Sequence, residues 1–309
     1  MSLVAALKGN GPTGFGYGST ADEVVKDLNL EGKNILITGC NSGLGLYTMQ
    51  TLSQKGARII AAARTIEKAK NATQDLSGEF LPMACELSEP TSVAKCADEL
   101  VKRGEHIDVI LCNAGIMALP KLQVQHGLEL QFLTNHIGHF ILITRLLDQL
   151  KDDGRVVLLS SSAHQMAPKK GIELDNLDGK QGYKPWRAYG QSKLANLLCA
   201  RELARRFEGS HKTANAVHPG VIMTNLGRHS QGDVINFLGS TLGNALFLKS
   251  IPQGAASQTY LAAHPDAAKY SGEYFADCNV AKSSAHGKDM ALAQALWEKS
   301  EEIVKDFNL

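Results

Sequence analysis

The chain has 309 residues, of which 44% are hydrophobic and 20% are charged, and its formal net charge is +1. These proportions are ordinary for a globular protein, and the near-neutral charge shows no bias toward nucleic acid or an anionic membrane. No stretch approaches the ~18 apolar residues of a transmembrane helix. The first apolar run has only five residues, LVAAL, so we also expect no signal peptide.

Residues 1–30 are Gly-rich and then acidic, and we expect them to form an extension on a single domain that covers 31–309. From residue 33, short apolar runs alternate with helical patterns. The predicted strands are 33–38, 58–63, 83–88, 107–113, 155–160 and 213–218, with 272–277 as a seventh. The predicted helices are 44–56, a polar helix that ends near 77, one that starts at 88–90, 127–150 and 189–207. Continuously apolar strands separated by helices predict an α/β fold, with a Rossmann-type doubly wound parallel sheet of about seven strands and helices on both faces.

The segment TGCNSGLG at 38–45 follows the first predicted strand and opens the first helix. Gly39 would permit a tight turn, Gly43 a close approach of the backbone to a diphosphate, and Gly45 close packing of the helix on the strand. The free N–H groups of the helix start would bind the phosphates. The alternative is an ordinary Gly-rich turn, but the position between a strand and a helix favours a nucleotide site.

The segment YGQSK at 189–193 places Tyr189 and Lys193 one helical turn apart. An ammonium beside a phenol favours the phenolate and lowers its pKa. Bringing a free tyrosine, with a pKa near ~10, to neutrality needs about 4 kcal/mol, which one cation about 4 Å away in a partly wet site could supply. The pair predicts an acid/base catalyst, although chance or an ordinary core tyrosine could also produce it.

The spacing TGxxxGxG together with YxxxK resembles the short-chain dehydrogenase/reductase family. Further motifs occur in the family's order: NAG at 113–115, Asn135 in the long helix, SS at 160–161 and PG at 219–220. The resemblance implies that Tyr189 is the proton donor or acceptor and that Lys193 lowers its pKa and holds the nicotinamide ribose. It also implies that a serine bonds the substrate oxygen and that Asn135 helps to hold a water linked to Lys193. Alignment of GRVVLLSS with the family pattern selects Ser161 among three consecutive serines.

The second predicted strand ends in AAAR, with Ala63 where an acidic residue would bind the 2′-hydroxyl of NAD, followed by Arg64. Since arginine suits a 2′-phosphate, this strand end predicts NADP as the cofactor. The alternative is that Arg64 is a surface residue at a helix start. By resemblance, Glu86 and Leu87 lie at the adenine, with the side-chain contact of Glu86 left open. The full set expected to bind the cofactor is Gly39, Ser42, Gly43, Leu44, Gly45, Arg64, Glu86, Leu87, Asn113, Ala114, Gly115, Tyr189, Lys193, Pro219, Gly220, Val221 and Thr224.

Residues 227–250 are amphipathic and occupy the segment that forms the substrate lid in the family, which predicts a small or mid-sized apolar carbonyl or alcohol substrate. Three segments, GFGYGSTADEV, YGQSKLANLL and GEYFADC…LWEKSEE, resemble the retinol dehydrogenase and WW-domain oxidoreductase branch. A homodimer is compatible with the sequence. The alternative function is an NADP(H)-sensing regulator that binds a protein partner on the same fold.

Six cysteines without a CxxC pair or metal-ligand spacing predict a reduced, cytoplasmic protein. His136 and His139 lie three residues apart on a predicted helix, but no carboxylate cluster or cysteine pair accompanies them. We therefore expect no metal site.

Overall fold

The computed structural model describes residues 8–222 and 248–309. Within these ranges one eight-stranded sheet has the order β10-β9-β8-β7-β4-β1-β2-β3. Its strands are β1 (Asn34–Thr38), β2 (Arg58–Ala63), β3 (Phe80–Ala84), β4 (Ile107–Cys112), β7 (Leu150–Leu159), β8 (Thr213–His218), β9 (Tyr274–Ala276) and β10 (Asn279–Val280). All neighbours are parallel except β9 and β10, which pair antiparallel. The predicted Rossmann-type fold is confirmed, and β10 adds one strand to the seven expected.

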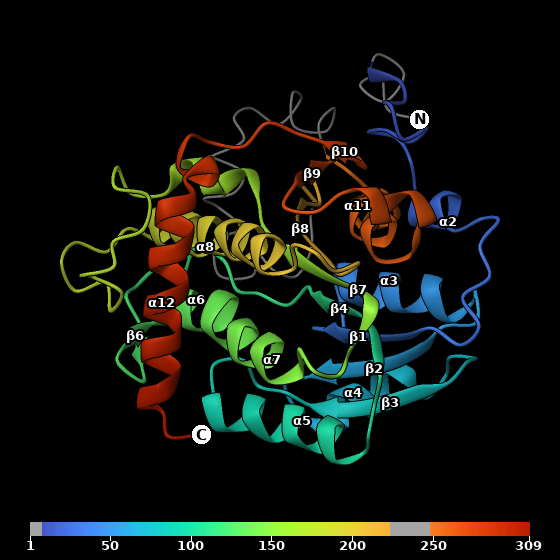
Figure 1. Cartoon of the computed structure of the whole chain (residues 1–309), viewed down its shortest axis with the longest axis horizontal. Helices are drawn as coiled ribbons and strands as arrows, with labels where there is room; N and C mark the ends of the chain where they lie inside the picture. Colours follow the sequence, from blue (N-terminus) through green and yellow to red (C-terminus); the bar gives the residue numbers. More distant parts are fainter. Residues whose placement is uncertain (1–7, 223–247) are drawn as a thin grey trace.

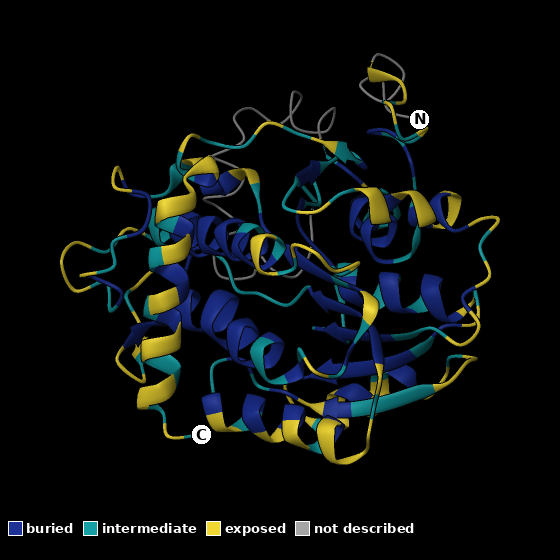
Figure 2. Cartoon of the chain, in the orientation of Figure 1, coloured by how far each residue is buried: buried dark blue, intermediate teal, exposed yellow. Residues whose placement is uncertain are grey.

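Helices cover both faces of the sheet (Figure 1). The helices are α2 (Ala21–Val24), α3 (Gly43–Ser53), α4 (Ile66–Thr73), α5 (Pro90–Lys102), α6 (Leu130–Phe132), α7 (Gly138–Leu146), α8 (Pro185–Arg206), α11 (Ile251–Ala263) and α12 (Met290–Asp306). Alternate residues of β1 divide between two cores: Ile35 and Ile37 join the core with α3 and α11, whereas Leu36 joins the core with α5, α7 and α8. Because both faces are buried, the strands are apolar throughout instead of alternating. Figure 2 shows the strands, α7 and α8 as mainly buried, with exposed residues on the outer sides of α5 and α12.

Two predicted elements differ from the structure. The third strand is Phe80–Ala84 and not 83–88. The prediction began the strand too late because Pro82, a residue that is rare inside strands, lies within it. A proline is tolerated there since β3 is the last strand at its edge of the sheet. The predicted helix 127–150 is interrupted: β5 (Val124–Gln125) and β6 (Leu128–Glu129) form a hairpin, and a π-helical turn at Leu133–Ile137 separates α6 from α7.

Residues at both ends of the chain pack on the sheet domain. In the N-terminal segment, Ala21, Val24 and Val25 are buried, and α2 lies beside α11 and α3 (Figure 1). At the C-terminal end α12 packs on α8, and its Trp297 ring lies 4.7 Å from the ring of Phe140 on α7. No helix of the described residues is both long and apolar enough to cross a membrane.

Candidate active site

The glycine loop joins β1 to α3 with the backbone that its spacing predicts. Gly39 and Gly43 have φ values of 68° and 56°, the left-handed region that glycine adopts without strain. A Cβ atom at Gly45 would lie 2.3 Å from the carbonyl oxygen of Gly39, so only glycine allows this helix to pack so closely on the loop. Ser42 is the N-cap of α3 and makes no side-chain capping bond. The first N–H groups of α3 therefore remain available to bind an anion.

The NAG segment after β4 is fixed to the same loop. The Asn113 side chain donates to the carbonyl oxygen of Thr38 at 2.9 Å, and the amides of Asn113 and Ala114 donate to the Thr38 hydroxyl at 3.0 and 3.1 Å. A Cβ atom at Gly115 would lie 3.0 Å from Asn135 Oδ1 and 3.4 Å from Lys193 Nζ. Three segments distant in sequence thus meet at the carboxyl ends of β1 and β4, where ligands bind in such sheets.

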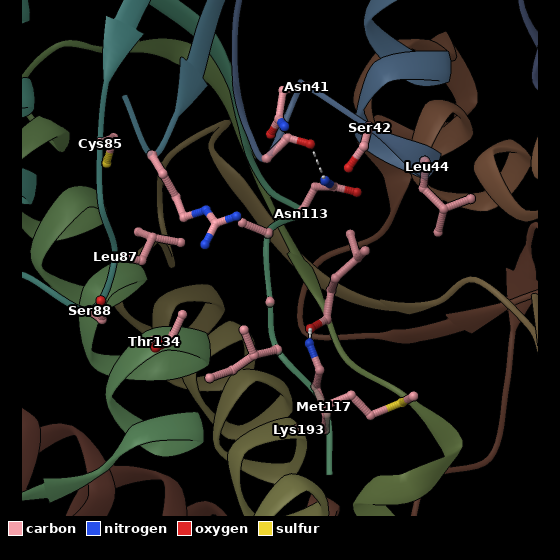
Figure 3. Close-up of a pocket in the computed structure, with 18 of the residues that line it drawn as sticks. Asn41, Ser42, Leu44, Cys85, Leu87, Ser88, Asn113, Met117, Thr134 and Lys193 are labelled. Atoms are coloured by element: carbon pink, nitrogen blue, oxygen red, sulfur yellow. Dashed lines mark hydrogen bonds between the residues drawn. The ribbon is translucent and has the colours of Figure 1, made fainter. Parts of the chain in front are cut away.

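A cavity of about 450 Å³ runs from this loop to α8. Figure 3 shows Asn41, Ser42 and Leu44 at one end, with Met117 and Lys193 farther along the cavity. The residues predicted to bind a cofactor that line it are Gly39, Ser42, Gly43, Leu44, Gly45, Arg64, Glu86, Leu87, Asn113, Ala114, Gly115, Tyr189, Lys193 and Pro219. The lining also includes residues that the sequence analysis did not single out: Asn41, Cys85, Ser88, Ile116, Met117, Leu119, Leu130, Thr134 and Leu159. Of the three consecutive serines, Ser160 lines the cavity and Ser161 does not.

Gly220 and Val221 are predicted cofactor residues that are not among those lining the cavity. Gly220 has a φ of 93° and packs on the Lys249 side chain, and Val221 accepts a hydrogen bond from the Lys249 amide at 2.9 Å. Thr224 and most of the expected lid at 227–250 lie outside the described residues.

Glu86 and Thr134 are two polar residues of the cavity lining whose side-chain contacts differ. The Glu86 carboxylate accepts hydrogen bonds from the Ser88 hydroxyl at 3.1 Å and from the Ser88 amide at 3.3 Å, so it closes its own turn. Thr134 is buried at the cavity wall, and within the described residues its hydroxyl has no hydrogen-bond partner. Because a buried hydroxyl without a partner is costly, Thr134 is suited to contact a polar ligand atom.

The three consecutive serines point to different partners. Ser160 is buried and its hydroxyl donates to the backbone carbonyl of Lys193 at 2.7 Å. The Ser161 side chain shares a hydrogen bond with Tyr189 and accepts one from the Ala163 amide at 3.1 Å. Ser162 donates its amide to His218 at 3.3 Å. Of the three, Ser161 is the one whose hydroxyl meets the predicted catalytic tyrosine.

Tyr189 and Lys193 lie on one face of α8, with Lys193 Nζ 5.6 Å from the centre of the Tyr189 ring. The ammonium donates to the carbonyl oxygen of Leu159 at 3.0 Å (Figure 3). Burial raises the pKa of Tyr189 to about 12, with the Ser161 hydrogen bond acting in the opposite direction. Burial lowers the pKa of Lys193 to about 8. The Tyr189 pKa therefore shifts in the direction opposite to the one expected, because desolvation disfavours the charged form of each group.

Asn135 lies in the π-helical turn and is completely buried. Its side chain exchanges two hydrogen bonds with the backbone of Ile116, at 2.8 and 2.9 Å, and donates to the hydroxyl of Ser192 at 2.9 Å. Asn135 thus ties the segment after the NAG motif to the helix that carries Tyr189. A π turn at such a position is common at functional sites.

The other expectations concern metals and cysteines. His136 bonds Ser300, and His139 bonds Thr38 and the carbonyl of Asn135. The described residues contain no group of three or more His, Cys, Asp or Glu side chains placed to hold a metal ion. All six cysteines are buried and form no disulfide.

This arrangement fits a dinucleotide and a reaction at an oxygen atom. A helix start with free N–H groups can hold a diphosphate, and Arg64 lies beside the cavity directly after β2. Tyr189 and Lys193 line the other end, where the phenol, the ammonium and the Ser161 hydroxyl beside the phenol can donate hydrogen bonds and a proton.

Comparison with known proteins agrees with this geometry. Residues 33–234 match the family model described as short chain dehydrogenase. The chain is 39% identical to short-chain dehydrogenase TIC 32 A, chloroplastic, of Brassica napus, with 99% of each chain covered. It is 36% identical to retinol dehydrogenase 14 of Homo sapiens, with 89% of this chain and 87% of the relative covered. The crystal structure of an uncharacterised protein from Mycobacterium paratuberculosis superposes with a TM-score of 0.74 at 34% identity, covering 93% of this chain and 98% of that one.

The family and the retinol dehydrogenase-like branch predicted from the motifs are therefore confirmed. The chain belongs to the short-chain dehydrogenase family, in the branch that contains the retinol dehydrogenases.

Proposed function

We propose that the protein is an NADP(H)-dependent oxidoreductase that interconverts a carbonyl and an alcohol on a mid-sized apolar substrate. The observation that carries this proposal is that Tyr189 and Lys193 line one end of the cavity that starts at the glycine loop, with the Ser161 hydroxyl beside the phenol of Tyr189. Two hydroxyl groups and an ammonium can stabilise and protonate a substrate oxygen whose charge changes during the reaction.

The preference for NADP rests on the end of β2. Ala63 is buried and offers no carboxylate to a ribose 2′-hydroxyl, whereas the exposed Arg64 lies at the cavity. An arginine can bind a phosphate through two parallel hydrogen bonds. Asn41 and Ser42 line the same end of the cavity and add polar groups for the phosphate.

When bound, the coenzyme would supply the hydride. The N–H groups at the start of α3 and the glycine loop would hold its diphosphate, and Lys193 its ribose. Ser161 would donate a hydrogen bond to the substrate oxygen, and Tyr189 would exchange a proton with it. Asn135 would hold the Ile116 backbone to Ser192 on α8, and Thr224 remains a predicted cofactor-binding residue.

The apolar character of the substrate is supported by the cavity wall. Ile116, Met117, Leu119 and Leu130 line the cavity and provide hydrophobic surface. Several relatives are named retinol dehydrogenases, and retinol is an apolar alcohol, which agrees with a hydrophobic substrate. Cytoplasmic location and a homodimer remain predictions, and the Brassica napus relatives are named chloroplastic.

The test is to incubate the purified protein with NADPH and a panel of apolar aldehydes and ketones, and to follow oxidation of NADPH. Tyr189→Phe should keep NADPH affinity and lose nearly all turnover, whereas Ser162→Ala, at the serine that does not meet Tyr189, should keep both. Tight NADPH binding without oxidation on any panel member would reject the enzyme and favour the NADP(H)-sensing regulator. Wild-type turnover in Tyr189→Phe would remove Tyr189 from the mechanism.

A further inference from the structure

His139 joins the carbonyl of Asn135 to the end of β1. Its Nδ1 lies 2.9 Å from the Asn135 carbonyl oxygen, which can only accept, so Nδ1 carries the proton. Its Nε2 lies 2.9 Å from the Thr38 hydroxyl. That hydroxyl already accepts the amides of Asn113 and Ala114, so its own hydrogen is free to donate to Nε2. The contacts fix one neutral tautomer, protonated on Nδ1.

His164 has the same arrangement on the other side of the site. Its Nδ1 lies 2.6 Å from the carbonyl oxygen of Ser161 and must donate to it. Its Nε2 accepts the amide hydrogen of Ser284 at 3.0 Å. A backbone N–H can only donate, so this histidine is also neutral and protonated on Nδ1.

Both imidazoles are held neutral by burial. His139 is fully buried, and desolvation lowers its pKa to about 4. His164 is also buried, and desolvation lowers its pKa. Neither side chain lines the cavity, so their contacts act through Asn135 and Ser161.

His136 provides an internal contrast on the same helical segment. It is equally buried, but its Nε2 lies 3.0 Å from the hydroxyl of Ser300, and that hydroxyl donates to the carbonyl of Leu296 at 2.8 Å. The Ser300 hydroxyl has two possible acceptors, Leu296 O and His136 Nε2, so this contact does not fix the tautomer of His136. The Nε2 contact of His136 goes to α12 instead of a predicted catalytic residue.

We propose that His139 and His164 are positioning residues of the active site, each donating Nδ1–H to the backbone carbonyl of one predicted catalytic residue. The roles of Asn135 and Ser161 on which this inference rests are those of the proposed function. His139 holds Asn135 to the β1 end and the NAG segment, and His164 holds Ser161 to the segment at Ser284. Asn135 extends the first network to α8, because it donates to Ser192, whose hydroxyl donates to the carbonyl of Tyr189 at 2.8 Å.

The first test reads the tautomers directly and needs no substrate. Long-range ¹H–¹⁵N NMR spectra of the ¹⁵N-histidine-labelled wild-type protein, assigned with single variants, should show His139 and His164 as neutral Nδ1–H forms. An Nε2–H form of His139 or His164 would overturn the inference, whatever the enzyme does.

The second test compares variants in steady-state kinetics. His139→Leu and His164→Leu should lower kcat by about tenfold to a hundredfold with little change in the Kd for NADPH, because the catalytic groups shift by a fraction of an ångström. His139→Asn and His164→Asn place an amide donor near the former Nδ1 position and should recover most of that loss. His136→Leu removes an equally buried imidazole and should keep the wild-type kcat.

Asparagine variants no better than the leucine variants would overturn the positioning role. Thermal unfolding of all five variants separates a loss of folding from a loss of rate, and the tautomer spectra decide the inference if a leucine variant fails to fold. A wild-type protein that binds NADPH but reduces no panel substrate would reject the proposed function, while the NMR result still decides the geometry inferred here.

Discussion

Gly190, between Tyr189 and the rest of the YGQSK motif, is the point where α8 touches the turn that carries Ser161. A Cβ atom at Gly190 would lie 2.5 Å from the carbonyl oxygen of Ala163 and 2.9 Å from the amide nitrogen of Ala167. Both atoms belong to the backbone of the 3₁₀ turn Ser162–Met166 or its end, and Ser161 is the N-cap of this turn. Glycine at this position therefore sets how close the Ser161 hydroxyl comes to the phenol of Tyr189.

The substitution Gly190→Ala should separate these two groups. To restore even the 3.0 Å limit for a Cβ contact, the turn must move by at least about 0.5 Å. Overpacking of this kind costs about 1–3 kcal/mol in the free energy of unfolding, offset by up to about 1 kcal/mol from the better helix propensity of alanine. A displacement near 1 Å at reacting groups costs about a hundredfold in rate, so we expect kcat to fall by at least about tenfold.

The assay is carbonyl reduction under saturating NADPH, with thermal unfolding measured on the same samples. Gly209→Ala is the matched control: Gly209 has a φ of 82° and open space around it, so alanine there strains the backbone without moving the site. It should lose about 1 kcal/mol of stability and keep the wild-type kcat. If Gly190→Ala also keeps the wild-type kcat, the close approach of α8 to the turn does not position Ser161, and the reasoning fails.

Three further predictions concern charge. Arg64→Ala should raise the KM for NADPH by about 10- to 100-fold, which corresponds to the loss of one charge-assisted hydrogen-bonding interaction, and should leave the KM for NADH unchanged. An equal rise in both KM values would reject Arg64 as the 2′-phosphate ligand. Lys193→Met should abolish turnover yet raise the melting temperature at neutral pH. Burial lowers the pKa of Lys193 from 10.5 to about 8, so keeping the lysine charged destabilises the folded state by on the order of 3 kcal/mol. That gain should be full below pH about 8 and fade as the pH approaches 10.5, where the lysine is neutral in both states; calorimetry at neutral and alkaline pH checks it. Alcohol oxidation should accelerate as the pH rises toward the Tyr189 pKa of about 12. Carbonyl reduction should be constant at neutral pH and decline above about pH 8, because Lys193 loses its proton. Initial rates measured in both directions across pH test this, and the same pH profile in both directions would refute it.

The parts of the site that depend on local sequence were predictable. Positive φ at Gly39 and Gly43 and the tight packing at Gly45 follow from glycine spacing between a strand and a helix. Ser161 was selected over Ser160 by the family pattern, since alternation along a strand shows only that one of two successive residues faces the site. The sequence could not reveal the hydroxyl of Thr134 at the cavity wall, because no motif contains it and only tertiary packing brings it there.

The fold was predictable in type but less so in detail. Buried strands leave continuous apolar runs, but Pro82 concealed the true start of β3. The π-helical turn at Leu133–Ile137 inserts an extra residue into a segment that is apolar almost all round, so the hydrophobic pattern could not reveal the break. The hydrogen bonds of His139 and His164 depend on partners far away in the chain, at Thr38 and Ser284.

The pairing of Tyr189 with Lys193 shows why residue spacing alone predicted the wrong direction for the shift of the tyrosine pKa. Spacing fixes the distance between two charges but contains no information on burial, and here burial dominates both groups. A phenol with a pKa of about 12 is fully protonated at neutral pH and still far more acidic than the alcohol formed when a carbonyl accepts a hydride. Proton donation to the nascent alkoxide is thus downhill, whereas the reverse reaction must first generate a phenolate at a cost of roughly 7 kcal/mol at neutral pH. The Ser161 hydrogen bond, which opposes burial, is already included in that pKa. The buried pair is consequently better built to complete the reduction of a carbonyl than to begin the oxidation of an alcohol.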